Sequence, residues 1–149
     1  MAAKHILACV DFSEHSTRSL AEVGEYARTN GSKVTLIHIS DPKAFVPPQT
    51  VVEAASVADD SAHRAELAKL RDQHLADVGV EIAVLADHAP AKAICEYAEA
   101  HGVDLIVVGS HGRGGVERWL IGSVAERVVR HATSNVYVVR RSLQRDSLP

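Results

Sequence analysis

Residues 105–115 read LIVVGSHGRGG, an apolar run that changes at once into a loop rich in glycine. An unbroken apolar run is typical of a strand that is buried on both faces of a parallel sheet. Because residues 105–108 form the most apolar run of the chain, we expect this strand to lie centrally. Helices must cover both faces of such a sheet, so the stretch predicts an α/β fold.

Two further apolar runs of the same character lie toward the N-terminus. Residues 6–10 (ILACV) and 34–39 (VTLIHI) each predict a buried strand. Between them, Ser13 can cap a helix whose apolar positions recur at helical spacing as far as Asn30 and Gly31, a typical helix end. A strand, a helix and a strand within about 35 residues predict a βαβ unit.

The middle of the chain predicts a loop, a helix and a strand near the edge of the sheet. Residues 41–56 contain three prolines, a density that predicts a loop. A helical period of apolar residues returns from about Asp59 and ends at Gly79. Residues 80–85 follow as a strand, and Glu81 within it favours a position near the edge.

The last third of the chain predicts two more helices and a closing strand. Pro90 suits the first turn of a helix that precedes the run at 105–108. Ser123 and Glu126 have the spacing of a capping box, which predicts a helix with Ser123 as its N-cap. Residues 136–139 (VYVV) form the fifth predicted strand.

The order of these elements predicts a doubly wound α/β fold, a five-stranded parallel sheet with helices on both faces. The chain of 149 residues has the size of one compact domain. We therefore expect a single domain over residues 1–149, with a polar tail from about residue 141.

Composition and charge exclude several classes of protein. Aromatic residues make up 4% of the chain and the net charge is -3, so nucleic acid is not expected as a partner. The apolar run near the N-terminus is too short for a signal peptide or a membrane span. Cys9 and Cys95 form no CxxC motif, which excludes a disulfide scaffold and a cysteine-rich zinc site. These features fit a cytoplasmic protein with no membrane partner.

Polar residues and glycines follow three of the expected strands, at the edge where open parallel sheets bind ligands. Asp11 follows the first strand, Ile39 ends the second, and Gly109 and Gly112 follow the fourth. Glycines let backbone N–H groups approach an anion, and a helix that starts near Ser123 adds its own N–H groups and its dipole. The arrangement predicts a phosphate chain in the loop, a ribose hydroxyl at Asp11 and a base on the apolar wall.

The glycine spacing distinguishes among phosphate-binding motifs. A P-loop requires a Lys after its glycines, and none follows Lys92. The dinucleotide fingerprint is absent as well, because no glycine-rich turn follows the first strand. A pattern that does fit without a gap is Gly-x2-Gly-x9-Gly-[Ser/Thr], at Gly109, Gly112, Gly122 and Ser123.

This motif resembles that of the universal stress protein family. The resemblance extends over nearly the whole chain through VDFSEHS after the first strand, HI at the end of the second, and the closing block GSVAERVVRHATSNVYVVR. It implies a Rossmann-like fold of the adenine nucleotide alpha hydrolase type. Two departures from the family are Asn135, where a proline often precedes the last strand, and the proline-rich insert at 41–56.

The nucleotide-binding branch of that family implies ATP as the ligand and a role for each motif residue. Asp11 is assigned to the ribose and the backbone of Ile39 to the adenine. Ribose and phosphates are assigned to Gly109, Gly112, Gly122 and Ser123. The resemblance also implies a homodimer that pairs the last strand, with Val136 and Val139 at its ends.

Each of these residues also has a structural interpretation. Two glycines after a strand are commonly turn residues, Asp11 could cap the first helix, and Ser123 could act as an N-cap only. Arg113 lies beside the glycines and could reach phosphate oxygens, although a lone surface Arg is more often solvated. The nine His show no metal-ligand spacing, so a Mg²⁺ or Mn²⁺ ion held by bound phosphates is the favoured metal role.

The sequence therefore predicts an ATP-binding homodimer that acts as a stress-response module with an unknown downstream protein. Its site offers backbone donors but no base, Lys or carboxylate pair for phosphoryl transfer, so an efficient enzyme is not expected. Two alternatives stay open. One is a slow ATPase or nucleotidyl-transferring enzyme, and the other is an interaction dimer that needs no nucleotide.

Overall fold

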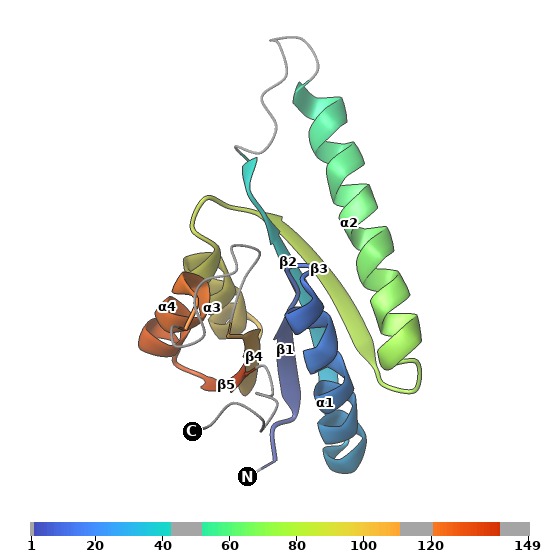
Figure 1. Ribbon diagram of the computed structural model, residues 1–149, viewed down its shortest axis with the longest axis vertical. Helices are drawn as coiled ribbons and strands as arrows, with labels where there is room; N and C mark the ends of the chain where they lie inside the picture. The colour runs from blue at the N-terminus through green and yellow to red at the C-terminus, as the bar shows by residue number, and fades with distance from the viewer. Residues whose placement is uncertain (1, 43–51, 111–120, 141–149) are drawn as a thin grey trace, which may run out of the picture.

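The computed structural model describes residues 2–42, 52–110 and 121–140 (Figure 1). Its elements are, in chain order, β1 (His5–Cys9), α1 (Glu14–Asn30), β2 (Lys33–Ser40), α2 (Val52–His74), β3 (Val80–Ala86), α3 (Pro90–Ala100), β4 (Leu105–Gly109), α4 (Ser123–His131) and β5 (Asn135–Val139). The strands are parallel and follow the order β3-β2-β1-β4-β5. The predicted five-stranded parallel sheet is confirmed.

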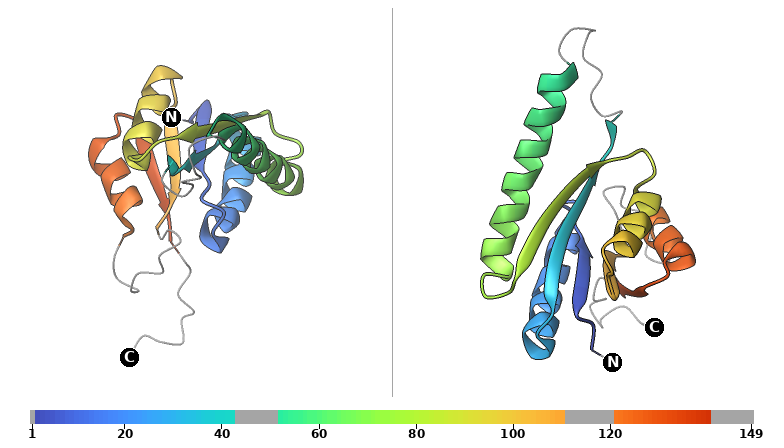
Figure 2. Two further views of the ribbon diagram at one scale, coloured as in Figure 1. Left: turned by 90° about the horizontal axis from the view of Figure 1, so that it is seen from above. Right: turned by 180° about the vertical axis from the view of Figure 1, so that it is seen from behind.

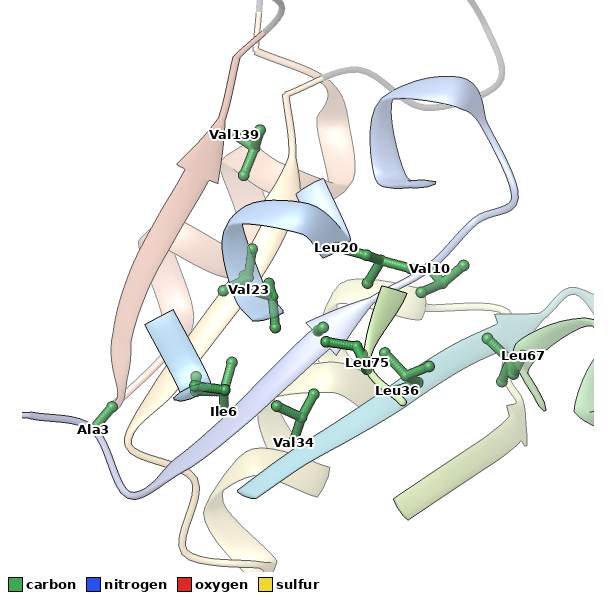
Figure 3. Close-up of a cluster of buried hydrophobic side chains, with 13 residues drawn as sticks. Ala3, Ile6, Val10, Leu20, Val23, Val34, Leu36, Leu67, Leu75 and Val139 are labelled. Atoms are coloured by element: carbon green, nitrogen blue, oxygen red, sulfur yellow. The ribbon is translucent and has the colours of Figure 1, made fainter. Parts of the chain in front are cut away.

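Helices lie on both faces of the sheet, as predicted. α1 and α2 cover one face, and α3 and α4 cover the other, which the view from above in Figure 2 shows. Successive residues of β1 alternate between the two layers, so that Ile6 packs with α1 and α2 whereas Leu7 packs with α3 and α4. Figure 3 shows the first of these cores, in which Ile6 and Leu20 are fully buried.

The direction in which the chain adds strands reverses at β1. From β1 the chain builds β2 and β3 on one side, and it then returns to place β4 and β5 on the other. The crevice outside the carboxyl ends of β1 and β4 is therefore the topological switch point, where open parallel sheets bind ligands. β4 is an interior strand, but the central strand is β1. The edge position expected for the strand that contains Glu81 is confirmed.

α1 begins and ends where the sequence predicts. The Ser13 hydroxyl accepts a hydrogen bond from the Ser16 N–H, and Ser13 is the N-cap. Gly31 ends the helix in the left-handed conformation, with φ 64°, which glycine adopts without the steric cost of a Cβ.

α2 differs from the prediction at both ends. It begins at Val52, where a loop was expected as far as residue 56, because the last proline before the helix is Pro48 and no Pro or Gly occurs within the helix. It ends at His74 rather than at Gly79, and a turn closed by the Val78 N–H and the Leu75 carbonyl (3.0 Å) follows. None of the described helices is long and apolar enough to cross a membrane.

The start of α4 corrects the predicted capping box. Gly122 is the N-cap. Ser123 is the first residue of the helix, and its side chain makes no capping bond. The cause lies outside the helix, because the Gly122 N–H donates to the Ser110 carbonyl at 2.6 Å and holds Gly122 at the turn. The Glu126 carboxylate accepts from Arg130 at 2.7 Å instead of reaching back to the cap.

Candidate functional site

A cavity of about 220 Å³ opens at the carboxyl ends of β1, β2 and β4, at the switch point of the sheet. Its lining comes from these three strands and from the first turns of α1, α3 and α4. The lining residues are Cys9, Val10, Asp11, Ser16, Ile37, His38, Ile39, Pro90, Ile94, Val108, Gly109, Gly122, Ser123, Val124 and Ala125. Five of the seven predicted site residues therefore line one cavity.

The two remaining predicted site residues, Gly112 and Arg113, lie outside the described residues. Ser110 and Gly122 lie on either side of the segment that contains them. The Ser110 N–H donates to the Val139 carbonyl at 2.9 Å, and the Ser110 carbonyl accepts from Gly122. The first bond joins the end of β4 to β5, and the second joins it to the start of α4. Gly109 and Gly122 therefore lie at the same edge of the cavity.

Asp11 stands in the turn between β1 and α1. Its Oδ1 accepts the Ser13 N–H at 2.9 Å, and its own N–H donates to the Ser16 hydroxyl at 3.3 Å. Phe12 between them has a positive φ of 62°, which is uncommon for a residue with a side chain. Ser13 rather than Asp11 caps the helix, and the Asp11 carboxylate both closes the turn and lines the cavity.

The backbone of Ile39 forms an open edge. β1 pairs with β2 only as far as Cys9 opposite Ile37, whereas β2 pairs with β3 through Ile39 and beyond. In a parallel ladder alternate residues face one neighbour, so Ile39 follows Ile37 as the next residue of β2 that faces β1. Among the described residues no backbone group bonds the Ile39 N–H or C=O on that side. Ile39 therefore presents one donor and one acceptor where it lines the cavity.

One thiol and one carboxylate lie in the described lining of the cavity. Burial, with smaller contributions from Cys95 and Asp11, raises the pKa of the Cys9 thiol, so this thiol stays protonated. Asp11 is the one carboxylate among the described lining residues, and they include no Lys or Arg. In the described segments no three His, Cys, Asp or Glu side chains gather as metal ligands would.

Several lining residues were not singled out from the sequence. Ser16 is buried and holds the turn at Asp11, while Pro90 and Ile94 from α3 form part of the apolar wall. Their helical spacing predicts only which side of a helix faces the sheet. The signal that could have found Pro90 is its place in the first turn after β3, since that turn begins at the same edge of the sheet.

The sequence profile of the universal stress protein family matches residues 2–140 of this chain. A universal stress protein of Thermus aquaticus is 31% identical over 137 residues, which cover 92% of this chain and 98% of the relative. The matched length includes every element that surrounds the cavity.

Solved structures of such proteins share the fold. A universal stress protein of Lactobacillus plantarum is 27% identical with a TM-score of 0.78, over 92% of this chain and 97% of the other. A universal stress protein in complex with cAMP is 23% identical with a TM-score of 0.71, over 94% and 98% of the two chains. One from Archaeoglobus fulgidus in complex with dAMP is 22% identical with a TM-score of 0.63, over 93% and 99%. With a matching profile, strand order and length, the chain belongs to the universal stress protein family.

Proposed function

We propose that this protein binds ATP in the cavity at the switch point and acts as a homodimeric stress-response module of the cytoplasm. The observation that carries the proposal is the open backbone edge of Ile39 beside an apolar wall. One N–H donor next to one C=O acceptor is the pattern that can pair with the donor and acceptor on the edge of an adenine. Aliphatic side chains such as Ile94 and Val108 supply a surface for its face.

The polar groups of the cavity suit the ribose and the phosphates of the nucleotide. The Asp11 carboxylate is an acceptor that suits a ribose hydroxyl. Gly109, Gly122 and the first N–H groups of the nine-residue helix α4 suit phosphate oxygens, and Gly112 and Arg113 are proposed to complete that cradle. Mg²⁺ or Mn²⁺ would be held by the phosphates. The structures with cAMP and dAMP support an adenine nucleotide as the ligand class.

The volume of the cavity suits part of the nucleotide rather than the whole of it. Pockets for drug-sized ligands measure about 300–1,000 Å³, and the 220 Å³ found here is smaller. We expect the base and the sugar to occupy it, with the phosphates outside, near the start of α4. Since the described lining offers one carboxylate and no Lys or Arg, we propose binding rather than rapid turnover.

The proposed homodimer would pair the β5 strands of two copies. β5 is an edge strand, and exposed edges invite pairing with another chain. The Asn135 N–H and the Val139 carbonyl bond to the β4 side, so the backbone of Val136 and Val138 faces the open edge. Val138→Pro removes an outward N–H that β4 does not use, and it should give a folded monomer in light scattering. An unchanged dimer mass would place the interface elsewhere.

A thermal melt tests the nucleotide proposal. A ligand that binds only the folded protein stabilises it by about 2.7 kcal/mol at a hundredfold excess over Kd, which raises the midpoint by several degrees. Millimolar ATP with Mg²⁺ should therefore shift the melt upward, and mass analysis of freshly purified, denatured protein should release an adenine nucleotide. A midpoint that ATP, AMP and cAMP all leave unmoved would refute the proposal.

A further inference from the structure

The end of β1 leaves the parallel ladder in an unusual way. The Val10 N–H still donates to the Ile37 carbonyl at 2.8 Å. In a regular ladder the Val10 carbonyl would next accept the Ile39 N–H. The Val10 carbonyl instead lies 2.7 Å from Nδ1 of His38, and no bond to Ile39 occurs among the described backbone groups. A side chain of β2 has thus taken the place of the backbone of β2.

We propose that His38 is a positioning residue for the base, an inference that rests on the proposed function. Its ring occupies the Val10 carbonyl, so the Ile39 N–H stays available to a ligand instead of closing the ladder. A carbonyl only accepts, so Nδ1 must carry the hydrogen and donate it. That hydrogen bond sets a hydrogen on Nδ1 and holds the plane of the ring toward the end of β1.

Packing holds the His38 ring in this orientation. The side chain is 7% exposed, and its ring centroid lies 4.6 Å from that of Phe12 and 4.4 Å from that of His63. Phe12 reaches the ring from the turn that bears Asp11, and His63 reaches it from α2. A ring fixed on two sides keeps its donor aimed at one acceptor. The contacts also join α2 to the edge of the proposed site.

Loss of the Nδ1–H donor of His38 should let the backbone of Ile39 pair with β1. Val10 is 3% exposed, and a buried carbonyl that loses its partner is unfavourable. The nearest backbone donor in ladder register is the Ile39 N–H, which would move onto the Val10 carbonyl. The Ile39 N–H, which is proposed to bind the base, would then donate to the Val10 carbonyl and would no longer be available to the ligand. An apolar side chain at position 38 should therefore weaken binding of the base, while a short amide should preserve it.

Two variants of the full chain test this role by calorimetric titration. His38→Leu removes the donor and keeps an apolar side chain, whereas His38→Asn keeps an N–H group near the place of Nδ1. We expect His38→Leu to weaken binding of ATP and of adenosine at least tenfold, and His38→Asn to stay within about threefold of the wild type. Adenosine has no phosphates, so an equal loss for both ligands shows that the effect does not arise at the phosphates. His38→Leu with wild-type affinity for both would overturn the proposal.

Amide hydrogen exchange of Ile39 provides a readout that does not require a ligand. In nucleotide-free protein this amide should exchange at least tenfold more slowly in His38→Leu than in the wild type or His38→Asn, because only the first variant closes the ladder. Equal rates in all three proteins would overturn the role of His38. If His38→Leu does not fold, His38→Gln, whose amide lies near the place of Nε2, takes its place. If the wild type binds no adenine ligand, the proposed function fails and the exchange rates still decide the backbone role.

Discussion

The two ends of the sheet differ in whether polar groups there are bonded within the protein or face a cavity. At the amino ends of β1 and β4, the Asp104 carboxylate accepts the N–H groups of Lys4 and His5 at 2.8 and 2.9 Å. The buried His5 ring lies 2.8 Å from the Thr35 hydroxyl and 3.2 Å from the His101 carbonyl. At the carboxyl ends, by contrast, the backbone of Ile39 faces a cavity.

This difference means that polar groups at the amino ends contribute to stability, whereas those at the carboxyl ends are available for binding. The bonds to Asp104 lower the pKa of its carboxyl, first through the N–H of His5 and then through that of Lys4, so the folded protein holds it ionised. Such groups contribute to the free energy of unfolding. Groups left open at the other end contribute little to it and remain available to a ligand. Variants at the amino ends should therefore change stability alone, and variants around the cavity should change affinity.

The largest effect is expected for Thr35→Val at the amino end. Thr35 is fully buried, and the change removes the hydroxyl partner of the His5 ring without a large change in volume. The free energy of unfolding should fall by about 1–3 kcal/mol in urea denaturation, because a buried polar group loses its partner. ATP affinity should not change. A loss of ATP affinity in folded Thr35→Val would contradict the expectation that variants at the amino ends change stability alone.

Asp11→Asn should give the largest effect on affinity. The amide keeps an oxygen for the Ser13 N–H, so the turn is retained while the negative charge is lost. ATP should bind at least tenfold more weakly, which is about 1.4 kcal/mol, in a calorimetric titration. The urea midpoint should stay close to that of the wild type. Wild-type affinity in Asp11→Asn would remove Asp11 from the site.

Ser123→Ala and Ser13→Ala form a matched pair with a smaller expected effect. Ser13 caps α1, and its loss should lower the free energy of unfolding by about 1 kcal/mol. Ser123 makes no capping bond, so its loss should leave stability unchanged and weaken ATP binding about threefold, or about 0.65 kcal/mol. Equal stability losses in the two variants would show that Ser123 is structural.

The smallest expected effect is a pH dependence that comes from His5. Burial first, and the charge of Lys33 second, lower the pKa of His5 from 6.5, so the folded state binds its proton less readily than the unfolded chain. The contribution of neutral His5 is complete above pH 6.5 and is lost as the pH falls from there toward the lowered pKa. His5→Gln should lose less stability than the wild type between about pH 7 and about pH 5. Equal losses in urea denaturation would exclude His5 as the source.

Much of the fold could be predicted from the sequence, because it depends on local patterns. Unbroken apolar runs predict the parallel strands, and Ser13 with Gly31 predicts both ends of α1. Asp11, Ile39 and Gly109 could be predicted to meet, since the carboxyl ends of parallel strands share one edge.

The features that were missed depend on contacts between distant residues. The N-cap of α4 is Gly122 because its N–H bonds to Ser110, twelve residues earlier, and a local capping pattern does not include that bond. The His38 bond to Val10 joins two strands, and periodicity predicts only that such a residue is buried. Where a side chain replaces a ladder bond, the sequence offers no local signal.

Binding of ATP at the carboxyl ends of the strands can be measured residue by residue through amide NMR of the labelled protein titrated with ATP and Mg²⁺. We expect saturable shifts for the amides of Asp11, Ile39 and Ser123 at a common Kd, while those of His5 and Asp104 stay in place. Absence of saturable shifts at millimolar ATP, or shifts concentrated at His5 and Asp104, would contradict this location of the ligand.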